Sequence, residues 1–309
     1  MKQHLKSMLS TGLRLAVTLL VFWLIFRSVD LRGVMQTMLG ANLPLLAVAL
    51  LFQLLSTLAA SWRWTLVMQR LDFGQDFMFY LRSYFKGSFF NQGLPTSIGG
   101  DALRVLDVAR TGHRKRDAFY GVAVDRGLGL GGLLIFNLIA LQLNPELLPH
   151  PVFLAINGLV SLGVAGFVAV YLLHKLRFLE RWPVTVVFIR ISQRLAQVLR
   201  SIPAAALHLV LSLFIHLLSL LCIYFIGTGV GLEFDLWTYM VIVPPVILLT
   251  IVPVSLAGWG VREGGMIGLF TLIGADKTLV LSMSILYGVA LIVTSLPGLF
   301  VYLTGKHHL

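Results

Sequence analysis

Long apolar runs, each about the length needed to cross a lipid bilayer, are the feature that most constrains this chain. The hydrocarbon core is about 30 Å thick, so a helix crosses it in about 20 residues. Six such runs are found, at residues 11–28, 43–68, 117–142, 152–173, 203–228 and 279–303. Because only 12% of the residues are charged and 58% are hydrophobic, the sequence excludes a water-soluble protein and predicts an all-α, polytopic membrane protein with a single transmembrane domain over residues 1–309.

Two further apolar stretches, residues 76–110 and 237–273, are each interrupted by a related segment. The segments read Pro95-Thr-Ser97-Ile-Gly99-Gly100-Asp101-Ala-Leu-Arg104 and Pro253-Val-Ser255-Leu-Ala-Gly258-Trp-Gly260-Val-Arg262. A proline, a serine, an apolar residue, small residues and an arginine fall in register between them. The helical pieces on either side of each segment are too short to span, so we predict two re-entrant helical hairpins.

The offset between these segments also relates the neighbouring spans. When it is applied to runs 43–68 and 117–142, it leads to runs 203–228 and 279–303. The predicted fold is therefore a pair of inverted repeats, each with three transmembrane helices and one re-entrant helical hairpin. Repeat 1 covers about residues 1–145, and repeat 2 covers about residues 150–305.

Lys and Arg side chains fall on one face of the membrane if the chain crosses it six times. They gather at the amino terminus, between residues 110 and 116, between residues 175 and 200, and near the carboxyl terminus. Because loops rich in these residues stay in the cytoplasm, we expect a multi-pass protein of the cytoplasmic (inner) membrane with both termini cytoplasmic. The formal net charge of +11 is then a topology signal, and nucleic acid is not expected as a partner.

The basic segment at residues 184–202 has apolar residues at helical spacing on one side and arginines and glutamines on the other. This pattern predicts an amphipathic helix that lies on the cytoplasmic headgroups as a connector. A regulatory or partner-binding helix is the alternative.

The hairpins carry the residues expected to bind substrate. Helix ends at a hairpin tip attract anions through free N–H groups, glycine allows a close approach of the backbone, and arginine binds phosphate with two parallel hydrogen bonds. The candidate residues are Arg63, Lys86, Asn91, Ser97, Gly99, Gly100, Asp101, Arg104, Asp125, Arg126, Ser255, Gly258, Arg262 and Glu263. An anionic lipid headgroup is the expected ligand, and no catalytic residue, metal or cofactor is expected.

Each candidate has a structural alternative. Arg262 and Glu263 form either part of the site or an ion pair and helix cap. Asp125 carries a coupling proton, balances a hairpin cation, or pairs with Arg126. Asn91 either contacts substrate or satisfies the backbone of the hairpin tip. The tryptophans of Trp62-Arg63-Trp64 suit an aromatic belt at the membrane interface, from which Arg63 would reach a lipid phosphate. His208 and His216 are expected to be packing residues.

Both hairpin segments, together with Trp62-Arg63-Trp64, resemble the signature segments of the lysylphosphatidylglycerol synthase transmembrane-region family, also called flippase-like proteins. The resemblance covers essentially the whole chain. It implies translocation of a phospholipid or of a polyprenyl- or isoprenoid-linked lipid. We expect no soluble aminoacyl-transferase domain after the last span, so lysyl transfer is not implied. The alternatives are a non-transporting accessory subunit of a lipid or glycolipid synthase and a membrane-embedded glycosyltransferase. A lipid-synthesis enzyme partner and a homo-oligomer are left open.

Overall fold

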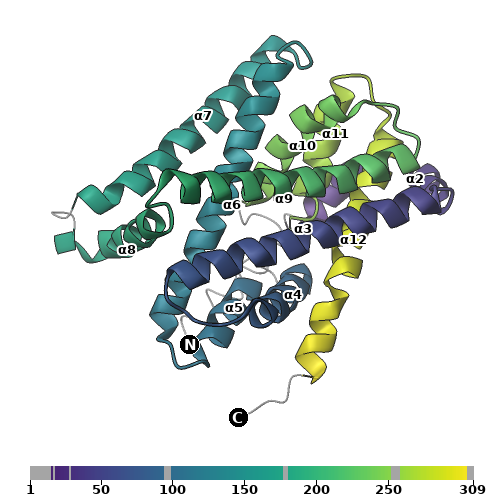
Figure 1. Ribbon diagram of the computed structural model, residues 1–309. Helices are drawn as coiled ribbons and strands as arrows, with labels where there is room; N and C mark the ends of the chain where they lie inside the picture. The colour runs from purple at the N-terminus through teal and green to yellow at the C-terminus, as the bar shows by residue number, and fades with distance from the viewer. Residues whose placement is uncertain are drawn as a thin grey trace.

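The computed structural model describes residues 15–16, 18–27, 29–93, 99–176, 180–251 and 258–304, and the regular elements of these residues are all helices (Figure 1). They are the helix Thr18–Arg27, α2 (Leu31–Leu39), α3 (Leu43–Arg70), α4 (Phe77–Gly93), α5 (Gly99–Ala109), α6 (Lys115–Leu143), α7 (His150–Leu172), η1 (Leu173–Lys175), α8 (Pro183–Val198), α9 (Ile202–Gly229), α10 (Leu236–Ile251), α11 (Val261–Thr271) and α12 (Lys277–Thr304).

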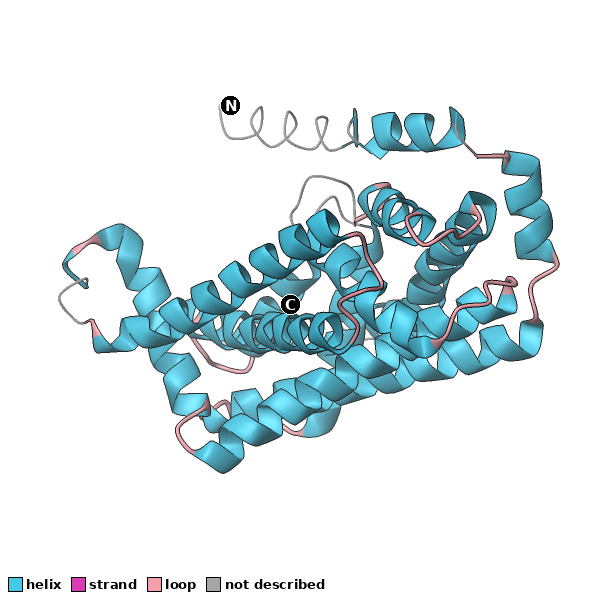
Figure 2. Cartoon of the chain, turned by 90° about the horizontal axis from the view of Figure 1, so that it is seen from above, coloured by secondary structure: helices cyan, strands magenta, loops and turns pink. Residues whose placement is uncertain are grey.

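Five of the described helices are long and apolar enough to cross a membrane: α3, α6, α7 with η1, α9 and α12. They correspond to five of the six predicted spans, and the all-α, multi-pass membrane fold is confirmed. Of the first predicted span, the helix Thr18–Arg27 is described, and residues 11–14 lie outside the described part of the chain. Figure 2 shows this helix along the periphery of the molecule, where Ile25 packs with Val34 of α2 and Leu281 of α12.

Both interrupted stretches form a pair of short helices, α4 with α5 and α10 with α11. The connecting residues 94–98 and 252–257 lie outside the described residues, and Ser97 and Ser255 are among them. Asp235 begins the second pair by accepting hydrogen bonds from the hydroxyl and the backbone N–H of Thr238, and these bonds lower the pKa of its carboxyl group. The predicted interruptions are therefore present, while re-entry into the membrane stays a prediction.

Helices of repeat 1 pack against helices of repeat 2, and these contacts come in corresponding pairs. α3 lies along α9 in the opposite direction, and the start of one meets the end of the other where Asn42 N donates to Gly229 O at 2.9 Å (Figure 1). α4 packs against α12 of the other half, and α10 packs against α6 in the same way. This pattern agrees with a two-fold relation between the halves, whose inversion across a membrane stays a prediction.

The predicted amphipathic helix is present as α8, and part of its apolar side meets protein, whereas Val187 and Phe188 stay exposed, so its position on the headgroups stays a prediction. Ile189, Leu195 and Val198 are buried, and α8 packs against α6 and α7. Arg194 bonds to Asp117 near the start of α6, and the side chain of Gln197 donates to the carbonyl oxygen at the end of α3. The basic residues of α8, of the start of α6 and of the end of α3 therefore lie together at one end of the helices. The charge pattern of the sequence predicts such a grouping.

Two glycines let α4 and its neighbours approach very closely. A Cβ atom on Gly100 would collide with the carbonyl oxygen of Gly87, so α5 meets α4 backbone to backbone. A Cβ atom on Gly298 of α12 would collide with the carbonyl group of Phe85 on the other side of α4. α4 is thus held between its own hairpin partner and the last helix of the other half.

We expect Gly100→Ala to destabilise the protein by about 1–3 kcal/mol, because the added methyl group overpacks the α4–α5 contact. Gly127→Ala is the matched control, since a Cβ atom on Gly127 of α6 meets nothing within 4 Å. Alanine favours a helix over glycine, so the control is expected to be neutral or slightly stabilising. Thermal unfolding of both variants in detergent measures the difference, and equal shifts would contradict the close contact.

Candidate functional site

A buried carboxylate on α6 joins two arginines from two other helices. Asp125, whose side chain is 1% exposed, accepts hydrogen bonds from Nε and an Nη of Arg63 on α3, both at 3.1 Å. Its second oxygen accepts from an Nη of Arg104 on α5 at 2.7 Å. Asp125 therefore fastens the first hairpin to α3 and α6.

The predicted alternative of an Asp125–Arg126 pair is wrong. Arg126 bonds instead to both carboxylate oxygens of Asp101 on α5, at 2.8 and 3.0 Å. Successive residues on a helix point in different directions, so neighbours in sequence face different partners. Asp101 also accepts from Arg104 at 3.0 Å, which closes a connected set that we call the arginine cluster. The arginine cluster consists of Arg63, Arg104, Arg126, Asp101 and Asp125.

The arginine cluster holds three positive and two negative charges, and its arginines differ in exposure. Arg104 is buried, with its guanidinium group 3.9 Å from the ring centre of Trp64 and 4.7 Å from that of Tyr84. The side chain of Arg126 is 50% exposed. Arg126 is thus the member of the cluster that a ligand reaches most easily.

The Trp62-Arg63-Trp64 segment does not form the predicted aromatic belt as a whole. Trp64 is fully buried beneath Arg104, whereas Trp62 is half-exposed on the outside of α3. Arg63 is also buried, and it donates to Ser212 Oγ of α9 at 2.9 Å in addition to Asp125. Trp64 and Arg63 therefore face the interior of the protein, where α3 carries polar side chains.

In the second hairpin, Arg262 is balanced by its own neighbour. Its Nη lies 2.6 Å from Glu263 Oε1, and both side chains are buried. The other carboxylate oxygen of Glu263 accepts from Gly260 N at 2.6 Å and caps the start of α11. Arg262 also lies over the rings of Trp259 and Tyr287, at 4.7 and 5.4 Å. The structural alternative, an ion pair and helix cap, is the arrangement observed.

Among the remaining candidates that the structure describes, Lys86 and Asn91 also have protein partners. Lys86 Nζ bonds to Asp107, and Lys86 lines a separate surface hollow. Asn91 Oδ1 accepts from Gly100 N at 2.8 Å, so it caps the start of α5, next to Gly99. Gly258 has a φ of +80°, a backbone conformation that favours glycine. These residues shape the two hairpins.

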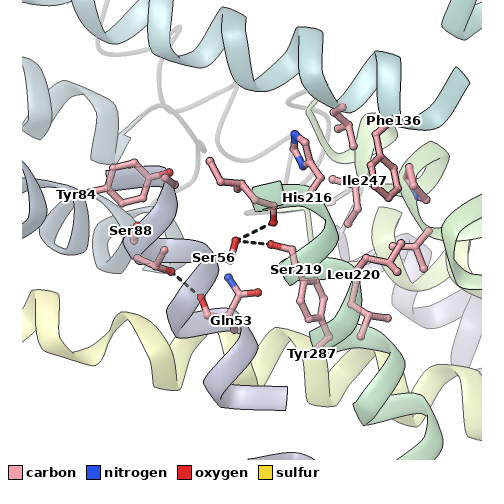
Figure 3. A pocket seen from close by; sticks show the side chains of 17 residues that line it. Gln53, Ser56, Tyr84, Ser88, Phe136, His216, Ser219, Leu220, Ile247 and Tyr287 are labelled. Atoms are coloured by element: carbon pink, nitrogen blue, oxygen red, sulfur yellow. Dashed lines mark hydrogen bonds between the residues drawn. The ribbon is translucent and has the colours of Figure 1, made fainter. Parts of the chain in front are cut away.

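A central cavity of about 260 Å³ lies where both halves meet (Figure 3). It is lined by Gln53, Ser56, Thr57, Ala60, Tyr84, Ser88, Leu133, Phe136, Ile215, His216, Ser219, Leu220, Ile223, Val243, Pro244, Ile247 and Tyr287. α4 and α10, one helix from each hairpin, contribute to opposite parts of its wall. Among these described lining residues there is no Asp, Glu, Lys or Arg.

The polar residues that line the central cavity, apart from His216, are not among those singled out from the sequence. Gln53, Ser56 and Thr57 recur at helical spacing on α3, which is a signal of a polar stripe on an otherwise apolar span. Ser219, the partner of Ser56, comes from α9, where Ser212, His216 and Ser219 recur at a similar helical spacing. His216 also lines the cavity, and its Nε2 bonds to Gly129 O at 2.9 Å, which confirms a packing contact.

A smaller cavity of about 120 Å³, the vestibule, lies beside the arginine cluster. Its lining residues are Tyr84, Gly87, Ser88, Asn91, Gln92, Asp101, Arg104 and Arg126. Tyr84 and Ser88 line both the vestibule and the central cavity. The charged vestibule and the uncharged central cavity are therefore adjacent, with α4 between them.

Comparison with known proteins gives one family. The family model described as "Lysylphosphatidylglycerol synthase TM region" matches residues 12–298. The match includes both hairpins, the arginine cluster and the central cavity. No curated protein matches the sequence.

Proposed function

Since the chain belongs to the lysylphosphatidylglycerol synthase TM region family, we propose that this membrane protein is a lipid translocator rather than an enzyme. The observation that carries the proposal is the central cavity, whose partly polar wall combines helices of both hairpins and both halves. In transporters built from repeats, the substrate site lies at the interface of the repeats and is formed by discontinuous helices. The cargo is a phospholipid or a polyprenyl- or isoprenoid-linked lipid, moved across the cytoplasmic membrane.

In this proposal the headgroup phosphate enters the vestibule and contacts Arg126. The arginine cluster carries one excess positive charge, which an anionic group would balance. Arg104 and Arg262 are already paired with carboxylates, and this pairing supports a role in holding the hairpins in position. The hydrocarbon tails stay in the lipid, and rocking of one half against the other exposes the cavity to each side in turn.

We also propose an orientation of the protein in the membrane. The basic end formed by α8, the start of α6 and the end of α3 faces the cytoplasm, where it meets anionic headgroups. Both termini then lie in the cytoplasm.

A reconstitution experiment tests the translocator. Vesicles with and without the protein receive a phospholipid with a fluorescent acyl chain, and dithionite bleaches the label as lipid reaches the outer leaflet. We expect the protein to add a second bleaching phase for an anionic phospholipid. The same bleaching with and without the protein, for anionic, zwitterionic and polyprenyl phosphate lipids alike, would contradict the proposal.

Arg126→Gln is expected to slow the transport of the anionic lipid about tenfold, because a charge-assisted hydrogen bond to the phosphate is lost. Arg190→Gln on α8 is the control, since Arg190 is exposed and its guanidinium bonds to Gln193. Equal transport rates for the two variants would show that Arg126 is not part of the binding site.

A further inference from the structure

We infer that the central cavity receives an uncharged, hydroxyl-rich part of the lipid headgroup, and that it disfavours a cationic aminoacyl headgroup. The inference rests on the proposed function and specifies the substrate class. The phosphate would occupy the vestibule, and the group attached to it would extend past Tyr84 and Ser88 into the central cavity.

The first support is the hydrogen-bonding capacity of the cavity wall. Gln53 is 8% exposed, and its Oε1 has no hydrogen-bond partner among the described residues although it lines the cavity (Figure 3). Ser56 Oγ lies 2.8 Å from Ser219 Oγ and also donates to a backbone carbonyl. A buried carbonyl oxygen without a donor is unfavourable. This oxygen is itself buried, so rotation of the Gln53 side chain toward the cavity would let a ligand hydroxyl group supply that donor.

The second support is the charge of the surroundings. The described cavity wall has no ionisable carboxylate that could pair with an ammonium group. Tyr84, which forms part of this wall, has the guanidinium group of Arg104 over its ring at 4.7 Å. An ammonium group in the cavity would therefore lose its water without gaining an anion, close to the net positive arginine cluster. A neutral polyol has no such penalty.

The third support is size and shape. At about 30 Å³ for each water molecule, the central cavity corresponds to about nine water-sized groups. This volume suits a glycerol or one sugar ring. The rings of Tyr84 and Tyr287 contribute to the wall, and the apolar faces of a polyol or sugar can pack against aromatic rings of this kind.

Native mass spectrometry of the purified full chain tests the inference with three lipids of identical acyl chains. Phosphatidylglycerol has a phosphate and a neutral polyol, phosphatidic acid has the phosphate without the polyol, and lysyl-phosphatidylglycerol has an added cation. We expect phosphatidylglycerol to bind about tenfold more tightly than either of the other two. Equal binding of all three, or preference for the lysyl lipid, would overturn the inference.

Gln53→Leu is expected to abolish the preference for phosphatidylglycerol over phosphatidic acid while leaving the unfolding temperature unchanged or raised. Gln69→Leu is the matched control on the same helix, because Gln69 is exposed and is not part of the central cavity. A Gln53→Leu variant that keeps the full preference would show that the central cavity does not distinguish between the headgroups.

Two further experiments distinguish this inference from binding of a soluble polyol phosphate and from failure of the proposed transport function. An excess of glycerol 3-phosphate is expected to leave bound phosphatidylglycerol in place, and complete displacement would mean that a soluble polyol phosphate is the ligand. Selective binding without any transport in vesicles would contradict the translocator and leave the headgroup assignment standing. Transport of all three lipids at one rate, with equal binding, would leave the translocator standing and contradict the headgroup assignment.

Discussion

Replacement of Asp125 by asparagine is expected to destabilise the protein by about 3–5 kcal/mol, because it leaves buried guanidinium groups without their counter-charge. Asp125 is the shared acceptor of Arg63 and Arg104, which come from α3 and α5. Its loss would remove the hydrogen bonds that join Arg104 of the first hairpin and Arg63 of α3 to α6, and only the Arg126–Asp101 pair of the cluster would still join the hairpin to α6. We expect a much lower unfolding temperature in detergent and a low yield of folded protein.

Asp117→Asn is the control for this prediction. Asp117 also pairs with an arginine, Arg194, but both side chains are partly exposed. Exposed ion pairs contribute about 1 kcal/mol or less, so this variant should unfold close to the wild type. If Asp125→Asn were as stable as Asp117→Asn, the buried ion pairs of the arginine cluster would not support the fold.

Ser88→Trp is expected to reduce lipid transport to the rate of protein-free vesicles. Ser88 is partly buried on α4 and lines both the vestibule and the central cavity. An indole ring at this position would intrude on the two cavities whose walls Ser88 helps to form, and we expect that the headgroup could no longer pass. Dithionite bleaching of a fluorescent phospholipid measures the loss, which should exceed about tenfold.

Two variants of the same helix serve as controls. Ser88→Ala keeps the space open and should transport within about twofold of the wild type. Met78→Trp introduces the same indole ring at an exposed position outside both cavities. An unchanged unfolding temperature for Ser88→Trp would confirm that the loss is not caused by misfolding, and normal transport by a folded Ser88→Trp protein would place the pathway elsewhere.

The spans and the hairpin helices could be predicted because they depend on local properties. The length and hydropathy of a segment decide whether it can cross a bilayer, and Gly and Pro residues interrupt it. The first span is described only in part, as the helix Thr18–Arg27, so its crossing of the membrane stays a prediction. α8 ends at Val198, earlier than predicted, because Ser201 caps the start of α9 and the connection must turn before it.

The partners of the buried charges could not be predicted in the same way. Asp125 bonds to residues on α3 and α5, which are far away in sequence, and only the packing of these helices brings them together. The same packing buries Trp64, for which composition favoured the membrane interface. Arg262 and Glu263 are adjacent in sequence, so their ion pair was foreseeable as an alternative.

The central cavity could be predicted in part. The polar stripe of Gln53, Ser56 and Thr57 on α3 has helical periodicity and could have been recognised. The opposite wall comes from α9 and α10 of the other half, and no local pattern shows that these residues face the stripe.

The passage of the headgroup between the two halves is tested most directly by a reversible block at Ser88. The variant Ser88→Cys, combined with Cys222→Ala to remove the buried native thiol, is reconstituted and treated with a bulky methanethiosulfonate reagent. We expect that labelled protein stops moving fluorescent phospholipid and that a reducing agent restores the movement. Undiminished transport by fully labelled protein would contradict it.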